Sequence, residues 1–347
     1  VTIHIARPSR TAGQTTTIDR VDYSVKPGSR LLEGTLKLKL RASQGGTRKL
    51  TLPANADLQR VTINQKERSL RATATKAGNV VQVPIRPGSQ QIELRWQQPW
   101  ERTLSERVPA VHVGGPAANV RVTVTTGEDR WLLWAFGPRW GPAVLFWSHL
   151  FILILLAIGL GRLRFLPLKT SHWLLLCLGF AQLPTPALLP VVGFFLAFSW
   201  RESFWRTRPA PQLATPFALT QIGLIGVMMI FLIALYAAIH SNLLMDLDMQ
   251  VKGTNSHNGH LVWYVDRTDG ALPMPGTLSL PIIVWRVAML LWSLWLVSAL
   301  LKWLQWAWRC FADGGLWRKF ESTPAPQQPT AQQEAKSAPI PPPPPQP

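Results

Sequence analysis

The residues of this sequence that are best suited to chemistry lie between positions 257 and 266. His257 and His260 are closely spaced in a polar stretch, and Asp266 follows a few residues later. Two imidazoles and a carboxylate are ligands that zinc accepts. His257, His260 and Asp266 are therefore candidate metal ligands, but no third strong ligand accompanies the two histidines, and we favour the interpretation as an ordinary polar extracytoplasmic loop.

Arg286 is the second candidate, because it lies early in the last long apolar run of the chain. A charged side chain inside a bilayer is costly and usually marks a functional site. Arg286, however, is only one or two helical turns from the predicted boundary of that run, where a long side chain can reach the interface. We favour this interfacial role and keep a functional intramembrane charge as the alternative.

No motif in the sequence points to a particular reaction. It contains no Walker A loop, no G-x-S-x-G elbow, no H-E-x-x-H pair and no G-x-G-x-x-G loop. We therefore assign no catalytic residue and no cofactor, and we expect a non-enzymatic protein. Cys177 and Cys310 lie in or beside apolar runs, so we interpret them as small buried side chains.

The composition indicates a membrane protein, so the candidate residues should lie in or near a bilayer. Hydrophobic residues make up 47% of the 347 residues and charged residues only 16%, against about 25% charged residues in an average soluble chain. The formal net charge is +18, and there are 17 tryptophans. Long apolar runs occupy residues 142–306, which excludes a wholly soluble protein, a disordered chain and a disulfide-stapled scaffold.

The first part of the chain carries the alternating pattern of β-strands. Leu36, Leu38 and Leu40 alternate with basic residues, and short runs of this kind are separated by turn signals. We predict an antiparallel β-sandwich outside the cytoplasm over residues 1–130, which an α-helical membrane domain follows over residues 131–311. A disordered, proline-rich cytoplasmic tail is predicted over residues 312–347.

Five membrane-embedded segments are predicted, at residues 142–161, 172–183, 187–200, 216–240 and 281–301. The stretch 173–200 is ambiguous, because Pro184 and Pro186 would break one long helix into two short halves. Cytoplasmic loops carry an excess of Lys and Arg. A hairpin at 173–200 satisfies this rule for every loop and puts the acidic loop 241–280 outside, whereas a single crossing does not. We therefore predict a bacterial inner-membrane protein with a periplasmic N-terminus, a cytoplasmic C-terminus and three basic clusters inside: Arg162, Arg164 and Lys169; Arg201, Arg206 and Arg208; Lys302, Arg309, Arg318 and Lys319.

Tryptophans gather where these segments should meet the membrane surface. An indole can keep its N–H in water while its ring lies in the lipid. The predicted interfacial anchors are Trp131, Trp134, Trp140, Trp147, Trp303, Trp306 and Trp308.

The lipid bilayer is the predicted partner of the helices. Residues 1–140 hold 22 basic and 10 acidic residues, a net charge of +12, so the β domain is predicted to bind an envelope protein or an anionic glycan. A solvated basic face is the alternative, and nucleic acid is not expected. The competing function, in a different class, is a membrane enzyme or carrier that acts on an envelope lipid or glycan through His257, His260, Asp266 or Arg286.

One stretch supports a resemblance to a known group of proteins. Residues 134–147 read WAFGPRWGPAVLFW, and PLK at 167–169 and HWLLL at 172–176 follow. Together they resemble the C-terminal part of large, uncharacterised inner-membrane proteins of Gram-negative bacteria, over about residues 30–310. The resemblance supplies no catalytic residue. Since the chain begins at Val1 without a visible export signal, it supports the expectation that this is part of a longer protein.

The predicted topology can be tested with single cysteines at Ser203 and Asn255. In intact cells, a membrane-impermeant maleimide should label the Asn255→Cys protein and leave the Ser203→Cys protein unlabelled, because the hairpin puts these sites on opposite sides. Labelling at position 203 from the periplasm would contradict the hairpin.

Overall fold

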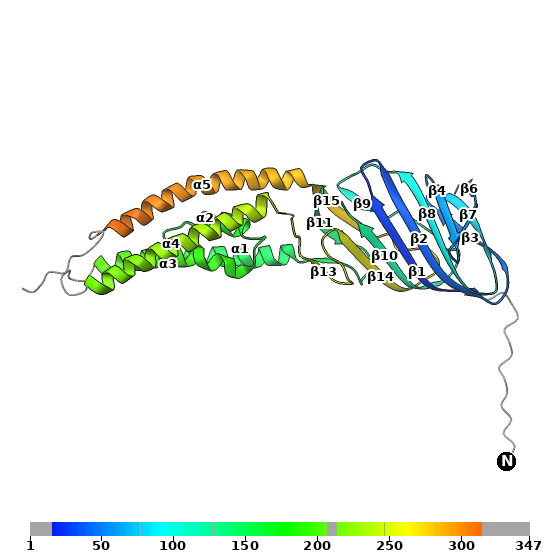
Figure 1. Cartoon of the computed structure of the whole chain (residues 1–347), viewed down its shortest axis with the longest axis horizontal. Helices are drawn as coiled ribbons and strands as arrows, with labels where there is room; N and C mark the ends of the chain where they lie inside the picture. Colours follow the sequence, from blue (N-terminus) through cyan, green and yellow to red (C-terminus); the bar gives the residue numbers. More distant parts are fainter. Residues whose placement is uncertain (1–15, 77, 128, 207–213, 246, 314–347) are drawn as a thin grey trace, which may run out of the picture.

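The computed structural model describes residues 16–313 except 77, 128, 207–213 and 246. The chain forms a β region at one end and a bundle of helices that extends from it at the other (Figure 1). The predicted proline-rich tail lies outside the described residues, apart from Ala312 and Asp313.

The β region is built around one seven-stranded sheet, in the order β14-β10-β1-β2-β8-β4-β5. We predicted an antiparallel sandwich, and this is wrong for one pair: β1 and β10 run parallel, with Val21 opposite Val120. Strands so far apart in the sequence can pair in parallel because the intervening chain makes the crossover. The strands of this sheet are β1 (Thr16–Pro27), β2 (Leu31–Ala42), β4 (Asp57–Ile63), β5 (Lys66–Arg68), β8 (Gly88–Pro99), β10 (Ala117–Thr125) and β14 (His260–Thr268).

Smaller sheets complete the region, in the orders β3-β7-β6, β11-β15-β9 and β12-β13. The expected alternation on β2 is confirmed, since Leu36, Leu38 and Leu40 are fully buried. Gly34 faces Trp96 so closely that a Cβ at position 34 would overlap the indole. The remaining strands are β3 (Gly46–Leu52), β6 (Ala72–Thr75), β7 (Gly78–Ile85), β9 (Ser105–Arg107), β11 (Arg130–Phe136), β12 (Ala143–Val144), β13 (Val251–Lys252) and β15 (Gly276–Pro281).

Residues 251–281, most of which the sequence assigns to the external loop 241–280, return to the β region as strands. β14 forms an edge of the large sheet by pairing with β10, and β15 pairs with both β11 and β9. Leu261, Val262 and Trp263 are all buried in succession, so this strand lacks the alternation that reveals a half-exposed strand. The β region is therefore made from two stretches of chain that flank the first four helices.

The helices are α1 (Phe146–Arg162), α2 (Thr170–Gly179), the 3-10 turn η1 (Thr185–Leu188), α3 (Leu189–Arg206), α4 (Ala214–Leu243) and α5 (Ile282–Ala312). Within the described residues, three helical stretches are long and apolar enough to cross a membrane, at residues 185–204, 217–243 and 282–312. α1 is shorter, with 17 residues, or about 26 Å at 1.5 Å per residue.

Long-range hydrogen bonds show how the helices are arranged. Near the β region, His149 at the start of α1 contacts Thr185 at 3.2 Å, and Asn242 of α4 donates to the Gly179 carbonyl of α2 at 2.6 Å. At the far end, Arg201 of α3 reaches the end of α5. α2 and α3 therefore run in opposite directions, and the chain turns back between them next to the β region.

Arg201 ties three helices together at the far end. Its side chain is 1% exposed and donates to the carbonyls of Cys310, of Phe311 at 2.7 Å and of Asp313 at 3.1 Å. The guanidinium also lies 5.6 Å from the ring centre of Phe217 on α4. Because the last carbonyls of a helix have no partner within it, Arg201 satisfies the end of α5. The sequence predicts Arg201 in a cytoplasmic loop, whereas the structure buries it between helices.

We predict that Arg201→Met lowers the free energy of unfolding by about 3 kcal/mol or more, because it leaves buried carbonyls without a charged donor. Thermal unfolding in detergent, followed by tryptophan fluorescence, measures this. Arg164→Met is the matched control, since Arg164 is exposed. An equal loss of stability in both variants would contradict the assignment.

Candidate functional site

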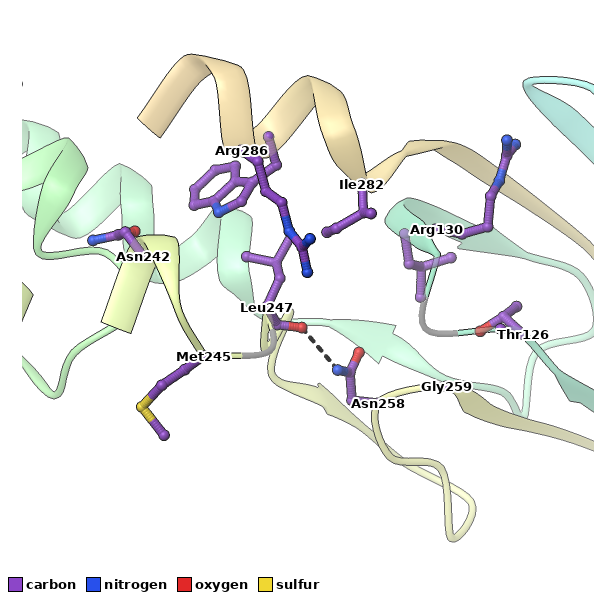
Figure 2. Close-up of a pocket in the computed structure, with 12 residues that line it drawn as sticks. Thr126, Arg130, Asn242, Met245, Leu247, Asn258, Gly259, Ile282 and Arg286 are labelled. Carbon is purple, nitrogen blue, oxygen red and sulfur yellow. Dashed lines mark hydrogen bonds between the residues drawn. The ribbon is translucent and has the colours of Figure 1, made fainter. Parts of the chain in front are cut away.

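The candidate site is a cavity of about 240 Å³ at the junction of the β region and the helices, where polar side chains from several elements converge. Four stretches of chain meet around it (Figure 2): the β10–β11 connection, the end of α4 with its following loop, the turn before β14, and the first turns of α5. Its lining residues are Thr126, Gly127, Arg130, Leu132, Asn242, Met245, Leu247, Asn258, Gly259, Ile282, Trp285 and Arg286. Asp246 lies outside the described residues.

The two arginines of the cavity differ in their bonding. Arg130 donates to the Thr103 carbonyl at 2.6 Å, and to the carbonyl at 2.9 Å and hydroxyl at 3.1 Å of Ser279. It therefore serves as a clamp between β11, β15 and the loop before β9. Arg286 has no hydrogen bond or ion pair with any residue that the structure describes. Figure 2 shows its side chain pointing away from α5, toward Leu247 and Asn258.

Asn242 adds a buried acceptor to the cavity wall. Its side chain is 2% exposed, and its amide nitrogen donates to the carbonyls of Gly179 at 2.6 Å and Ala238 at 2.7 Å. Its Oδ1 has no donor among the described residues. A buried oxygen without a partner costs about 1–3 kcal/mol, so a ligand or water that donates to it is favoured.

The predicted histidine pair lies beside this cavity. His257 and His260 exchange two backbone hydrogen bonds of 2.9 Å, which close a tight turn over Asn258 and Gly259, and their rings stack at 4.9 Å. Asn258 points into the junction, where its amide donates to the Leu247 carbonyl at 2.8 Å.

The structure does not bring Asp266 to the histidines. Asp266 is exposed and lies six residues beyond His260 on the extended strand β14, a separation of about 20 Å along a strand. Within the described chain, no group of three His, Cys, Asp or Glu residues could hold a metal ion. The described structure therefore does not gather the three candidate ligands into one cluster.

Burial and the neighbouring His257 lower the pKa of His260 below its ordinary value of 6.5. The folded protein therefore favours the neutral form of this imidazole. As the pH falls through 6.5, the unfolded chain binds a proton that the folded chain resists, so folding stability falls.

Three of the predicted tryptophan anchors expose their rings. Trp134 is 54% exposed, Trp140 is 63% exposed and Trp308 is 59% exposed. Trp134 and Trp140 belong to the β region next to the helices, whereas Trp308 lies near the end of α5. These exposed rings lie toward both ends of the helical bundle.

The other four predicted anchors pack within the protein instead. Trp131 packs edge-on against Trp285 at 5.1 Å, and Trp147 donates from its ring nitrogen to the Leu133 carbonyl at 2.7 Å. Trp303 and Trp306 both contact Phe195, at 5.4 Å and 5.9 Å. The sequence places a ring near a boundary but does not show which side of the helix it occupies.

Sequence reasoning identified Arg286 and missed Asn242, Asn258 and Arg130. The missed residues are ordinary polar side chains in loops or at element ends, and only the return of residues 251–281 brings them together. No local signal in the sequence marks them.

No protein-family model matches the chain, and no curated protein sequence matches it. Among solved structures, an M1 zinc metallopeptidase from Deinococcus radiodurans is 17% identical, covers 35% of this chain and 35% of that chain, and has a TM-score of 0.25. Native leukotriene A4 hydrolase from Saccharomyces cerevisiae is 8% identical over 36% of this chain and 25% of that chain, with a TM-score of 0.26. The match thus spans about a third or less of those proteins, and likenesses this low carry no argument about fold or function.

We predict that acid lowers the melting temperature less in His260→Gln than in the unaltered protein. Between pH 7.5 and pH 5.5, the unaltered chain loses the stability linked to its neutral imidazole, whereas the glutamine variant has no such group to protonate. Melting curves at several pH values measure the difference. His112→Gln is the control, because His112 is exposed. Identical pH profiles for His260→Gln and the unaltered protein would contradict the prediction.

Proposed function

We propose that this chain is an integral protein of the bacterial inner membrane whose helices hold a β region at the periplasmic surface, where that region binds a negatively charged partner. The observation that carries the binding role is a cluster of exposed basic residues at the end of the β region. We call it the basic tip, and it consists of Lys66, Arg68 and Arg71, on β5 and its connection to β6.

The membrane part of the proposal rests on the outward surfaces of the long helices. On α4, Ile222, Ile230 and Ile233 are each more than half exposed, and on α5 Leu291 and Leu294 are as well. Exposed apolar surface of this extent is unfavourable in water and favourable against lipid chains. α5 alone has 31 residues, or about 46 Å of helix, which exceeds a hydrocarbon core of about 30 Å.

The proposed orientation rests on where the basic residues lie. Arg162 ends α1, Arg201 lies near the end of α3 and Arg309 lies in the last turn of α5. All three of these helix ends lie at the end of the bundle away from the β region. Under the positive-inside rule, that end faces the cytoplasm and the β region faces the periplasm.

Charge pairing explains why the tip, rather than the sheet face, would bind an anion. On the large sheet, Arg20 pairs with Asp22 at 2.7 Å and Arg41 pairs with Asp19 at 2.8 Å. Lys37 and Arg95 share Glu93. Much of the positive charge of this face is therefore neutralised locally.

The basic tip keeps its charge. Glu67 is the only acidic residue between positions 58 and 92, and it already pairs with Arg60 at 3.3 Å. The strands around the tip lie at the end of the molecule opposite the helices (Figure 1). A concentrated positive potential there would attract an acidic protein or an anionic glycan approaching from the periplasm.

We predict that the triple variant Lys66→Gln, Arg68→Gln, Arg71→Gln binds immobilised heparin or polyglutamate about tenfold more weakly at low salt than the unaltered protein, because it removes most of the local potential. Elution salt concentration and equilibrium binding of the full chain in detergent measure this.

The matched control is Lys26→Gln, Arg121→Gln, Arg267→Gln, which removes three exposed charges on β1, β10 and β14, away from the tip. It should bind nearly as well as the unaltered protein. An equal weakening in both triple variants would show that only the net charge matters and would contradict a binding role of the tip.

A further inference from the structure

We infer that the cavity at the junction is a binding site for the phosphate-bearing headgroup of a phospholipid, and that Arg286 holds the phosphate. The inference rests on the proposed membrane insertion, which puts this junction at the level of lipid headgroups. It concerns a different surface from the basic tip and assigns a ligand of a different class.

Charge at the cavity favours a phosphate. Arg286 has no partner among the described residues, and none of the residues described as lining the cavity is an aspartate or a glutamate. The helix that carries Arg286 also begins at the cavity, without a side-chain cap and without an acidic residue in its first turn. The N–H of Ile282 is taken by the Asp129 carbonyl, so the positive end of the helix macrodipole, together with the guanidinium, is what would act on the anion.

The side-chain oxygen of Asn242, in the cavity wall, lacks a hydrogen-bond donor among the described residues. The Asn242 side chain is almost fully buried. Inorganic phosphate at neutral pH offers mainly acceptors, whereas the headgroups of phosphatidylethanolamine and phosphatidylglycerol carry an ammonium or hydroxyl donor next to the phosphate. A phospholipid headgroup therefore offers an anion to the guanidinium, and its donor can reach the Asn242 Oδ1, which is closed to solvent, once the side chains around that oxygen shift.

The size of the cavity fits a compact group. Its volume of about 240 Å³ lies below the roughly 300–1,000 Å³ of pockets for drug-sized ligands. A headgroup fits this space, with its acyl chains outside the cavity against the helices.

The surroundings of the cavity are suited to lipid. Met245 lines the cavity and is 60% exposed, and its neighbour Leu244 is 76% exposed. Trp134 and its cross-strand partner Leu278 are also exposed near the junction. Exposed apolar and indole side chains at this level are typical of a membrane interface, so a lipid can enter from the bilayer.

Native mass spectrometry of the full chain in detergent tests the inference. The probes are short-chain phosphatidylglycerol and phosphatidylethanolamine, diacylglycerol with the same chains, and inorganic phosphate. We expect one phospholipid to bind per chain and diacylglycerol to bind at least about tenfold more weakly, since it lacks the phosphate. Arg286→Gln should weaken phospholipid binding about tenfold, which corresponds to about 1.4 kcal/mol.

Two further variants make the result decisive. Arg267→Gln removes an exposed charge on β14 and should bind phospholipid like the unaltered protein. Ile282→Trp fills the cavity and keeps Arg286, so it should also weaken binding. Inorganic phosphate could instead displace the lipid fully and lose its own binding in Arg286→Gln. In that case Arg286 binds a phosphate group, as inferred, but the ligand is free phosphate rather than a phospholipid.

Unchanged phospholipid binding in Arg286→Gln, or equal binding of diacylglycerol, would overturn the inference. Carbonate extraction of cell membranes separates this failure from failure of the proposed function. Arg286→Gln should stay in the extracted membrane whether or not it binds lipid, whereas a chain released by carbonate would refute membrane insertion itself.

Discussion

The arrangement of the whole molecule depends on the direct passage of strand β15 into helix α5. Pro281 is paired with Arg130 in the strand, and the next residue, Ile282, donates its backbone N–H to the Asp129 carbonyl at 2.9 Å. The Asp129 side chain in turn holds Arg102 at 3.1 Å. Arg102 donates to backbone carbonyls at the end of β1. The start of the longest helix is thus bonded through several residues to the first strand, so the helix and the β region meet at a defined angle and enclose the junction cavity.

The arginines at the two ends of α5 lie in opposite electrostatic environments. At its C-terminal end, Arg201 from another helix lies where the helix macrodipole is negative and carbonyls need donors, so the charge is fully used. At its N-terminal end, Arg286 lies where the macrodipole is positive and disfavours a cation. A cationic guanidinium beside the amides of the helix start lowers the folding stability unless an anion binds there. This contrast is the physical reason to treat Arg201 as a structural residue and Arg286 as a ligand-binding one.

The positive charge of the protein separates into parts with different roles. Residues 1–140 contribute a net +12 of the total +18. On β1, β2 and β8 of the large sheet, four basic side chains pair with carboxylates at 2.7 to 3.7 Å. Other exposed basic residues are left without a carboxylate partner among the described residues; those of the basic tip lie far from the helices, and Arg286, from the later part of the chain, lies at the junction. These two places are suited to different anions, since the tip is open to solvent whereas the junction is a small cavity next to apolar surface.

The sequence by itself determined where the long apolar helices lie and the strand pattern of the first domain, because hydropathy and alternation are local properties of a few consecutive residues. It also singled out Arg286, since a charge in an apolar run is visible without a structure. It could not reveal that residues 251–281 return as strands, because Leu261, Val262 and Trp263 are buried together and read as an apolar run. Only the tertiary structure decided that His257 and His260 lie apart from Asp266, that Arg201 is buried, and that Asn242 and Arg286 share a cavity. These arrangements depend on contacts between residues far apart in the sequence and on which side of a helix faces its neighbours. The spacing of nearby residues does not encode either property.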